Sequence, residues 1–299
     1  MNVGRWLTLL AVVACGTTYT AAAPASPLVS ATWLADHLHD ADLVVLAADD
    51  GYGAGHIPGA RHVALPDLSV ERDGLRLEMP SSEDLRQGLA ALGISDRSRI
   101  VVYYGSVTVA TRIMFTLDYA GFGGASFLLD GGMAAWTRGG HPVTTDVPPA
   151  RTGTLGALGL KPIVVDAAFV LAHLNAPHFA VVDARAAAFY DGSQAGGPPS
   201  QPQRPGHIRG AFSVPYTSVV DDHMAFRTAD DLATVFAKAG VKPDDTIIGY
   251  CHIGQQATAM LLAARSIGHP VVLYDGSFED WSRHPEYPVD NPAGRSGRR

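Results

Sequence analysis

The sequence predicts an α/β protein of two tandem domains, each a parallel β-sheet flanked by helices on both faces. Short apolar runs of strand length alternate with helical runs, which is the pattern of sheets buried on both sides. The chain has 299 residues, enough for two domains of ordinary size. A set of motifs also occurs twice in the same order, so the two domains are expected to be copies of one fold.

Three motifs carry this internal repeat. A Gly-His-Ile motif recurs 151 residues later, an apolar strand-like run 147 residues later, and an Asp-Gly motif followed by tryptophan 145 residues later. The matched segments are 55–60 with 206–211, 99–103 with 246–250, and 128–136 with 273–281. Because the offsets drift by only a few residues, the copies are expected to align along their whole length.

The first copy is predicted to span residues 28–145. Its expected helices are 30–38, 81–92 and 108–119, and its expected strands are 42–46, 99–104 and 127–129. Ser30, and either Ser81 or Ser82, are expected N-cap residues, because their hydroxyls accept hydrogen bonds from N–H groups in the first helical turn. Gly93 suits the left-handed residue that ends a helix.

A Pro- and Gly-rich stretch, 146–161, is predicted to link the copies. The second copy is predicted to span 162–290, with a short tail at 291–299. Relative to the first copy it carries an insertion, 192–205, rich in Pro and Gly. We expect this insertion to be a loose surface loop, and contact with the active site is the alternative.

Cys251 is the expected nucleophile. It follows the strand-like run 246–250 and precedes an Ala-rich helical run, 257–267. A loop between a strand and a helix directs successive N–H groups at one place, and the helix N-terminus adds partial positive charge. A thiolate at such a position is stabilised. Cys251 is also the only cysteine outside the N-terminal leader, which predicts an unpaired, reactive thiol.

Residues 1–27 read as an export signal and spacer. Arg5 precedes an apolar run, 6–14, that is too short to span a bilayer. Two processing routes are open: lipidation of Cys15 in a lipobox-like Val-Val-Ala-Cys sequence, or ordinary cleavage after Ala25. Both predict export to the periplasm or cell envelope, with membrane contact only through a lipid anchor. We expect a monomer.

Composition excludes several functions. The chain carries 22 Lys and Arg against 29 Asp and Glu, and no basic stripe indicates a nucleic-acid partner. Its 12 histidines are scattered without the spacing of metal ligands, so no metal site is expected. A phosphatase of the cysteine-loop type needs an arginine six residues after the cysteine to clamp phosphate. Ala257 stands there, which argues against that class.

The motifs together resemble a known family. They are Asp183-Ala184-Arg185 after a strand, Gly-His-Ile-Arg-Gly-Ala at 206–211, the Cys251 loop, and Leu-Tyr-Asp-Gly-Ser-Phe-Glu-Asp-Trp at 273–281. Over about residues 28–290, the chain resembles the tandem rhodaneses, which are thiosulfate or 3-mercaptopyruvate sulfurtransferases. The resemblance implies two rhodanese-like domains, an active site near the cleft between them, and no metal or organic cofactor.

The resemblance also implies a mechanism. The Cys251 thiolate takes sulfur from a small donor and becomes a persulfide, and cyanide or a thiol then removes that sulfur. Backbone N–H groups of the loop are expected to bind the donor and both anionic forms of sulfur. The loop residues expected to contribute are His252, Ile253, Gly254, Gln255 and Gln256.

Arg185 is expected to bind an anionic donor, and an ion pair with Asp183 is the alternative. Asp183 is expected to brace the loop. The His252 side chain is expected to point away from the cradle rather than act as acid or base. The loop, Cys-His-Ile-Gly-Gln-Gln, matches neither the thiosulfate-type nor the mercaptopyruvate-type sequence of the family. Arg185 and the helix dipole favour thiosulfate as donor, with 3-mercaptopyruvate as the alternative.

The first copy is predicted to be non-catalytic. Aligning the two sequences places Tyr104 at the position of Cys251, and Leu46 and Ala48 at the positions of Asp183 and Arg185. One other function stays open: a relay or binding module that loads sulfur once and delivers it to a dedicated protein partner. Steady-state turnover with small donors separates a free-standing enzyme from such a module.

Overall fold

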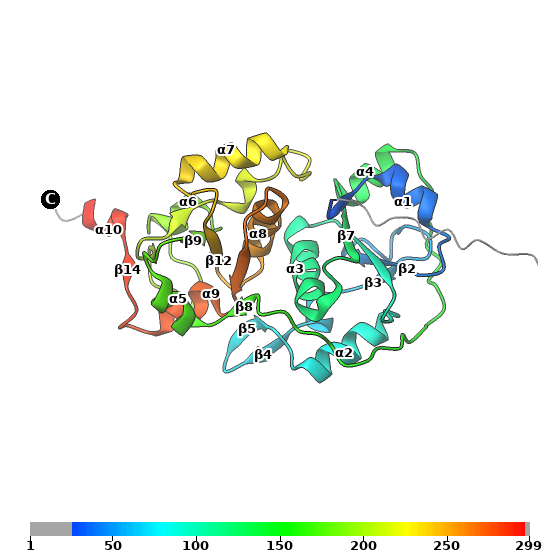
Figure 1. Ribbon diagram of the computed structural model, residues 1–299, viewed down its shortest axis with the longest axis horizontal. Coiled ribbons are helices and arrows are strands. Elements are labelled where there is room, and N and C mark those ends of the chain that lie inside the picture. The colour runs from blue at the N-terminus through cyan, green and yellow to red at the C-terminus, as the bar shows by residue number, and fades with distance from the viewer. Residues whose placement is uncertain (1–25, 297–299) are drawn as a thin grey trace, which may run out of the picture.

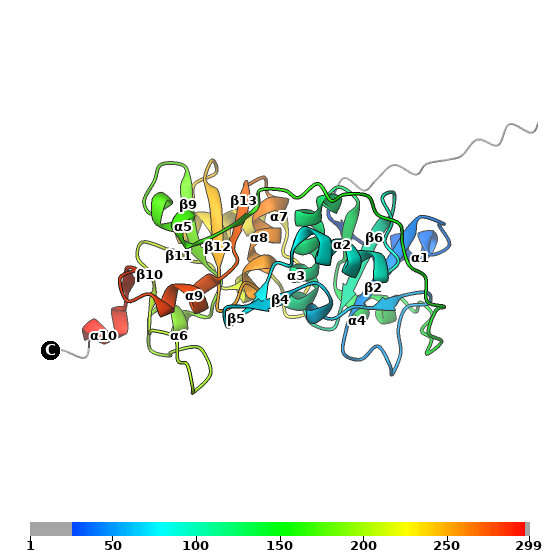
Figure 2. The same ribbon diagram turned by 90° about the horizontal axis from the view of Figure 1, so that it is seen from below.

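The computed structural model describes residues 26–296 and consists of two α/β domains side by side (Figures 1 and 2). Each domain contains one five-stranded sheet in which every pairing is parallel. The strand orders are β1-β7-β6-β2-β3 and β8-β13-β12-β9-β11, which are the same order in two copies. The predicted fold class is therefore confirmed.

In the first domain, the sheet strands are β1 (Leu28–Val29), β2 (Leu43–Ala48), β3 (Arg61–His62), β6 (Arg99–Tyr104) and β7 (Ser126–Leu129). The helices are α1 (Ala31–His37), α2 (Ser82–Ala91), α3 (Val107–Leu117) and α4 (Gly132–Arg138). An antiparallel hairpin, β4 (Val70–Arg72) and β5 (Leu75–Glu78), extends toward the second domain (Figure 1).

In the second domain, the sheet strands are β8 (Val164–Val165), β9 (Phe179–Asp183), β11 (Phe212–Ser213), β12 (Thr246–Tyr250) and β13 (Val271–Tyr274). The helices are α5 (Ala167–His173), α6 (Ala187–Tyr190), α7 (Ala229–Ala239), α8 (Gln256–Ser266), α9 (Ser277–Arg283) and α10 (Pro292–Ser296). A two-stranded antiparallel pair, β10 (His207–Ile208) and β14 (Val289–Asp290), closes the domain.

Helices cover each sheet on both faces, and the inner faces share one core. Helices α1 and α4 pack on the outer face of the first sheet, and α5 and α9 on the outer face of the second. Helices α3 and α8 lie side by side between the two sheets, and α2 and α7 border the same apolar cluster, which runs from one domain into the other (Figure 1). This shared core makes the domain boundary a packed interface.

Local sequence signals explain where several elements begin and end. The Ser30 hydroxyl accepts a hydrogen bond from the first turn of α1, and Ser81, rather than Ser82, caps α2 in the same way. Gly93 follows α2 with φ of 84°, in the left-handed region predicted for it. The predicted helix 108–119 is shorter, because α3 ends at Leu117 and a π-helical turn follows it.

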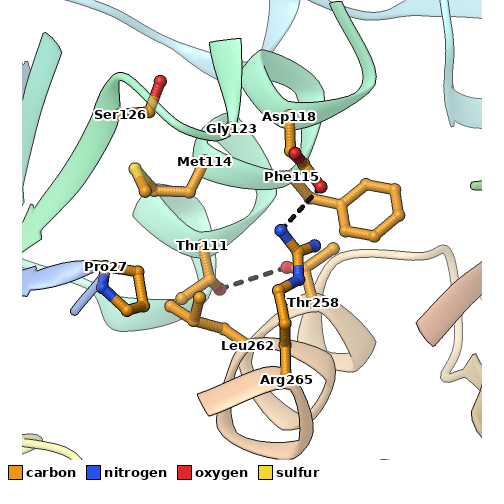
Figure 3. A pocket seen from close by; sticks show the side chains of 10 residues that line it. All are labelled: Pro27, Thr111, Met114, Phe115, Asp118, Gly123, Ser126, Thr258, Leu262 and Arg265. Carbon is orange, nitrogen blue, oxygen red and sulfur yellow. Dashed lines mark hydrogen bonds and ion pairs between the residues drawn. The ribbon is translucent and has the colours of Figure 1, made fainter. Parts of the chain in front are cut away.

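The domain interface has approximate two-fold symmetry centred on α3 and α8. Thr111 and Thr258, which are equivalent in the two copies, meet with their hydroxyl oxygens 3.1 Å apart (Figure 3). Nearby, the Arg265 guanidinium pairs with Asp118 of the other domain at 2.6 Å (Figure 3). Equivalent residues can touch each other only near a symmetry axis. The two domains, which are copies in the sequence, are therefore also related by an approximate two-fold axis in space.

The segment 145–163 forms neither helix nor strand, and part of it packs along the first domain. The Gly153 N–H, for example, donates to the Ala90 carbonyl at the end of α2 at 2.7 Å. Across residues 26–296, none of the helices has the length and apolar character that crossing a membrane requires. The leader and Cys15 lie outside the described residues.

Candidate active site

Cys251 lies at the carboxyl edge of the second sheet, directly after its central strand. Strand β12 has β9 on one side and β13 on the other, and α8 begins at Gln256. The Cys251 side chain is fully buried. Open α/β sheets bind ligands at the carboxyl ends of their strands, so the predicted nucleophile stands where the topology places a site.

The start of α9 holds the beginning of the loop. The Cys251 carbonyl accepts a hydrogen bond from the Phe278 N–H at 3.0 Å, and the His252 carbonyl accepts one from the Glu279 N–H at 3.0 Å. The Ser277 hydroxyl accepts from the Cys251 N–H at 3.3 Å. The N–H groups of Phe278 and Glu279 belong to the first helical turn, which offers them no partner inside their own helix. The loop satisfies them and is fixed by them.

Arg112 holds the end of the loop from the other domain. Its Nη1 donates to the Gly254 carbonyl at 3.3 Å, and its Nη2 forms an ion pair with the Asp275 carboxylate at 2.8 Å. Nη2 also donates to the Leu77 carbonyl in the β4–β5 hairpin. The Arg112 and Asp275 side chains are 1% and 6% exposed. Sequence reasoning missed Arg112, although it is the single charged residue of helix α3, which is a detectable signal.

Holding these carbonyls turns the loop N–H groups inward. In a trans peptide, the C=O and the following N–H point in opposite directions. The carbonyls of Cys251, His252 and Gly254 face outward to their donors, so the N–H groups that follow them face the inside of the loop. Within residues 26–296, the N–H groups of 252–256 donate no hydrogen bonds. They form a cradle that can bind an anionic sulfur.

Gly254 is the one loop residue whose backbone requires glycine. Its φ is +76°, in the left-handed region. A Cβ at this position would lie 3.0 Å from Arg112 Nη1 and 3.0 Å from the Asp275 carbonyl oxygen. Both the backbone angle and the close approach of Arg112 therefore exclude a larger residue.

Arg185 is paired with Asp183 inside the domain. Its Nη2 lies 2.6 Å from the Asp183 carboxylate, and the side chains are 1% and 0% exposed. Nη2 also donates to the Gly206 carbonyl at 2.8 Å, and the guanidinium carbon lies 4.0 Å from the centroid of the Phe278 ring. This geometry matches the alternative given for Arg185, an ion pair with Asp183. It supports Phe278, whose N–H binds the Cys251 carbonyl.

Most residues of the insertion 192–205 are exposed, as expected of a surface loop, but Gln203 packs against the Cys251 loop. The Gln203 side chain, 5% exposed, donates from Nε2 to the His252 carbonyl at 3.3 Å. Its Oε1 lies 2.9 Å from His252 Nδ1, so the proton of the imidazole is on Nδ1. The Phe189 ring meets the imidazole edge to face at 4.6 Å. The insertion is therefore a surface loop that also makes the alternative contact with the candidate site.

His252 is a neutral imidazole. Burial, assisted by the charge of Arg185, lowers its pKa to about 4 from an ordinary value of 6.5. An imidazole with this pKa is a weak base near neutral pH. The side chain is held against the insertion by its hydrogen bond with Gln203.

The remaining predicted loop residues lie at the domain interface. Gln255 donates from its side-chain Nε2 to the Thr108 hydroxyl of α3 at 3.1 Å. Gln256 is the first residue of α8, and Ile253 is partly buried. The loop therefore contacts both domains. Across 26–296, no group of three or more His, Cys, Asp or Glu side chains is arranged to hold a metal ion.

Strand register corrects one part of the sequence alignment between the copies. Tyr103 and Tyr250 play the same part, because each hydroxyl accepts a hydrogen bond from the isoleucine N–H of a Gly-His-Ile motif. Tyr104 is therefore equivalent to Cys251, as aligned. In the sheets Tyr103 pairs with Ala47, and Tyr250 pairs with Asp183.

This register makes Ala47, not Leu46, the equivalent of Asp183. It also makes Asp49, not Ala48, the equivalent of Arg185. The alignment was wrong by one residue because short apolar strands match each other in more than one register. The first copy lacks the cysteine and carries an acidic residue where the second carries Arg185.

Comparison with known proteins agrees with this geometry. Residues 30–138 and 166–284 each match the Rhodanese family, whose description is a rhodanese-like domain. The chain belongs to the rhodanese family. Both matches lie within the described residues, one in each α/β domain. The tandem organisation of this rhodanese is therefore evident in its sequence, its fold and its family matches.

Curated relatives of this rhodanese are sulfurtransferases. The 3-mercaptopyruvate sulfurtransferase of Escherichia coli K12 is 30% identical over 276 residues, covering 88% of this chain and 97% of that protein. The thiosulfate sulfurtransferase of Rattus norvegicus is 28% identical over 289 residues, covering 91% and 97%. The crystal structure of SseA from Escherichia coli, titled a 3-mercaptopyruvate sulfotransferase, has a TM-score of 0.74 at 29% identity, covering 84% and 98%.

Proposed function

We propose that this rhodanese transfers sulfane sulfur from a small donor to a thiophilic acceptor through a persulfide on Cys251. The observation that carries the proposal is the loop geometry. Cys251 stands at the carboxyl edge of the sheet, and the loop carbonyls are held outward, so that the N–H groups of 252–256 are available to an anion. Such preorganised donors stabilise a thiolate and a persulfide alike.

The proposed reaction has two half-reactions. The Cys251 thiolate attacks the outer sulfur of the donor and forms an S–S bond. With thiosulfate, the donor S–S bond breaks and sulfite leaves with the electron pair. With 3-mercaptopyruvate, the C–S bond breaks and the carbon takes up a proton, so pyruvate leaves. Cyanide or a thiolate then attacks the outer sulfur of the persulfide, and the Cys251 thiolate is regenerated.

The surroundings of the loop bear on the choice of donor. The sequence argument for thiosulfate used Arg185 as an available cation, but Arg185 is paired with Asp183. The nearby Arg112 is likewise paired with Asp275. The attraction for a dianion therefore comes mainly from the loop N–H groups. We propose that 3-mercaptopyruvate is used at least as well as thiosulfate.

The burial of Cys251 favours a small-molecule acceptor over a sulfur-relay partner. Cys251 is fully buried, and the Gln203–His252 contact holds the insertion against its loop. A cysteine of a partner protein needs a wider opening than cyanide or a low-molecular-weight thiol. Robust steady-state turnover with small donors and acceptors is the outcome that the enzyme proposal requires.

The experiment is a thiocyanate-forming assay on the leader-free protein with each donor in parallel. Cys251→Ser is the control, and circular dichroism verifies its fold. We expect turnover with at least one donor that disappears in Cys251→Ser. A folded wild-type protein that loads one sulfur but does not turn over would favour the relay module. A protein that forms no persulfide with either donor would contradict the proposal.

We also propose that the protein is exported. The support is the N-terminal sequence, in which Arg5 precedes the apolar run 6–14 and Cys15 follows as the lipidation candidate. Mass spectrometry of the mature N-terminus and cell fractionation test this. A diacylated Cys15 indicates an anchor in the envelope, and Ser26 as first residue indicates ordinary cleavage. An unprocessed Met1 in the cytoplasmic fraction would contradict export.

A further inference from the structure

We infer that Arg112, contributed by the domain without a catalytic cysteine, is a positioning residue for sulfur transfer: it aims the Gln255 N–H into the persulfide cradle. This inference rests on the proposed function of the Cys251 loop. It assigns to the first domain an active part in the chemistry beyond forming a wall of the site.

The contact pattern of Arg112 carries the inference. The guanidinium is buried in the interface, and its two terminal nitrogens make different contacts. Nη2 pairs with Asp275 at 2.8 Å, which compensates the buried charge. Nη1 donates to the Gly254 carbonyl at 3.3 Å, which is a contact to the catalytic loop itself. The first contact is sufficient for a structural ion pair, and only the second reaches the loop.

The direction of the Gly254–Gln255 peptide gives this contact its consequence. Its carbonyl points at Arg112, so its N–H, on Gln255, points to the opposite side. At a φ of +76°, Gly254 lacks the side-chain constraints that restrict other residues. Without Arg112, this peptide has no described partner on its carbonyl and is free to rotate. The cradle then loses one fixed donor, while the donors set by α9 stay in place.

The first domain has no equivalent of this contact. Position 112 corresponds to Ala259 in α8, and position 254 corresponds to Val107, already inside α3. Of the two equivalent position pairs, only the one at the Cys251 loop therefore places an arginine of one domain against a glycine of the other. An arginine that served only to hold the two domains together would not need to contact the Cys251 loop.

Two variants separate positioning from interface stability. Arg112→Lys keeps a cation that can pair with Asp275, but its single ammonium cannot serve both acceptors with the fork of a guanidinium. Arg112→Ala removes both contacts. The matched control is Arg265→Ala, which breaks another interdomain ion pair, with Asp118, far along the same helix pair from the loop (Figure 3).

The measurement is the single-turnover rate of persulfide formation on Cys251, followed by mass spectrometry, together with kcat, KM and Tm. We expect both Arg112 variants to lose about 10- to 100-fold in that rate, less than the roughly 100- to 1000-fold of a deleted donor. Arg112→Lys is expected to retain most of the wild-type Tm. Arg265→Ala is expected to lower Tm without lowering the rate constant of the folded fraction.

Wild-type rates in Arg112→Lys, or equal losses in Arg265→Ala, would overturn the inference. If Arg112→Ala does not fold, Arg112→Lys decides. A wild-type protein that never transfers sulfur would contradict the proposed function instead. In that case, alkylation of Cys251 by iodoacetamide, which needs no sulfur donor, still compares the variants. Identical alkylation rates across wild type and both Arg112 variants would then overturn the inference.

Discussion

The two copies of the domain end their central strands in different ways. In the first copy, Tyr104 fills the position equivalent to Cys251, and its hydroxyl donates to the Met224 carbonyl of the second domain at 2.8 Å. In the second copy, the smaller side chain of Cys251 occupies that position. The carbonyl equivalent to that of Met224 belongs to Leu77, and it accepts a hydrogen bond from Arg112.

The helix starts differ as well. Helix α3 begins at Val107, whereas α8 begins at Gln256, two residues later in the aligned numbering. The opened turn contains Gly254 and places residues 254 and 255 in a loop, where the equivalent residues of the first copy already belong to the first turn of α3. The comparison teaches that the same strand-loop-helix frame becomes a site by unwinding half a helical turn and replacing a large side chain with a thiol.

Restoring the first-copy residue in the Cys251 loop has the largest expected effect on activity. Gly254→Val introduces the residue found at the equivalent position 107. A β-branched side chain at φ of +76° is strained by about 1–3 kcal/mol, and its Cβ would meet Arg112. We expect kcat to fall by about 100-fold or more, because small displacements of reacting groups cost that much.

The assay is thiocyanate formation, with Gly124→Val as control. A Cβ added at Gly124 would meet no atom within 4 Å, and the backbone there is not left-handed. A Gly254→Val protein with wild-type kcat would show that the opened turn is unimportant.

Removing the buried carboxylate, as in the first copy, is expected to act on stability. Asp183→Ala reproduces the equivalent Ala47 and leaves Arg185 buried without its partner. Breaking a buried ion pair in this way costs about 3–5 kcal/mol. Urea unfolding measures the loss. The double variant Asp183→Ala with Arg185→Met should recover much of it, and equal stability of the single and double variants would contradict the assignment.

The burial of His252 against Gln203 and Phe189, which the first copy lacks, predicts that stability depends on pH. The pKa of His252 is about 4 in the folded protein against an ordinary 6.5. As pH falls from 6.5 to 4, the unfolded chain binds a proton at this residue and the folded protein does not. The free energy of unfolding should therefore fall over this window, by up to about 3 kcal/mol.

Urea unfolding at pH 4.5 and pH 7 for wild type and His252→Asn measures this contribution. The variant should lose less stability between the two pH values than wild type does. In a Gln203→Ala variant, the His252 resonance should titrate closer to 6.5, since the insertion no longer encloses the ring. Parallel stability curves for wild type and His252→Asn would contradict this contribution.

The smallest effect on stability and activity is expected at the contact between equivalent residues of the two copies. Thr111→Val removes the contact with its equivalent, Thr258, across the approximate symmetry axis. A hydrogen bond of this kind contributes about 1 kcal/mol. We expect a Tm decrease of a few degrees and an unchanged kcat. A large drop in kcat would mean that the symmetric contact, and not only Arg112, transmits to the loop.

Much of the architecture could be read from local patterns. The alternation of apolar strands and helices, the caps at Ser30 and Ser81 and the glycine after α2 act over a few residues. The repeat offsets revealed the two-domain organisation, and the switch from strand to helix at Cys251 predicted the location of the candidate site. These features are encoded in neighbouring residues, so a sequence shows them directly.

The tertiary structure alone decided how the site is assembled. Arg112 reaches Gly254 across 142 positions of sequence, and Gln203 reaches His252 across 49. Arg185 had two plausible partners in sequence, a donor anion or Asp183, and burial resolved the choice in favour of the carboxylate. Local patterns carry no record of such contacts, because they depend on which surfaces meet once both sheets have formed. The sequence by itself was enough to predict the fold, its duplication and Cys251 as the candidate nucleophile. The packing of the two copies determined which residues surround Cys251.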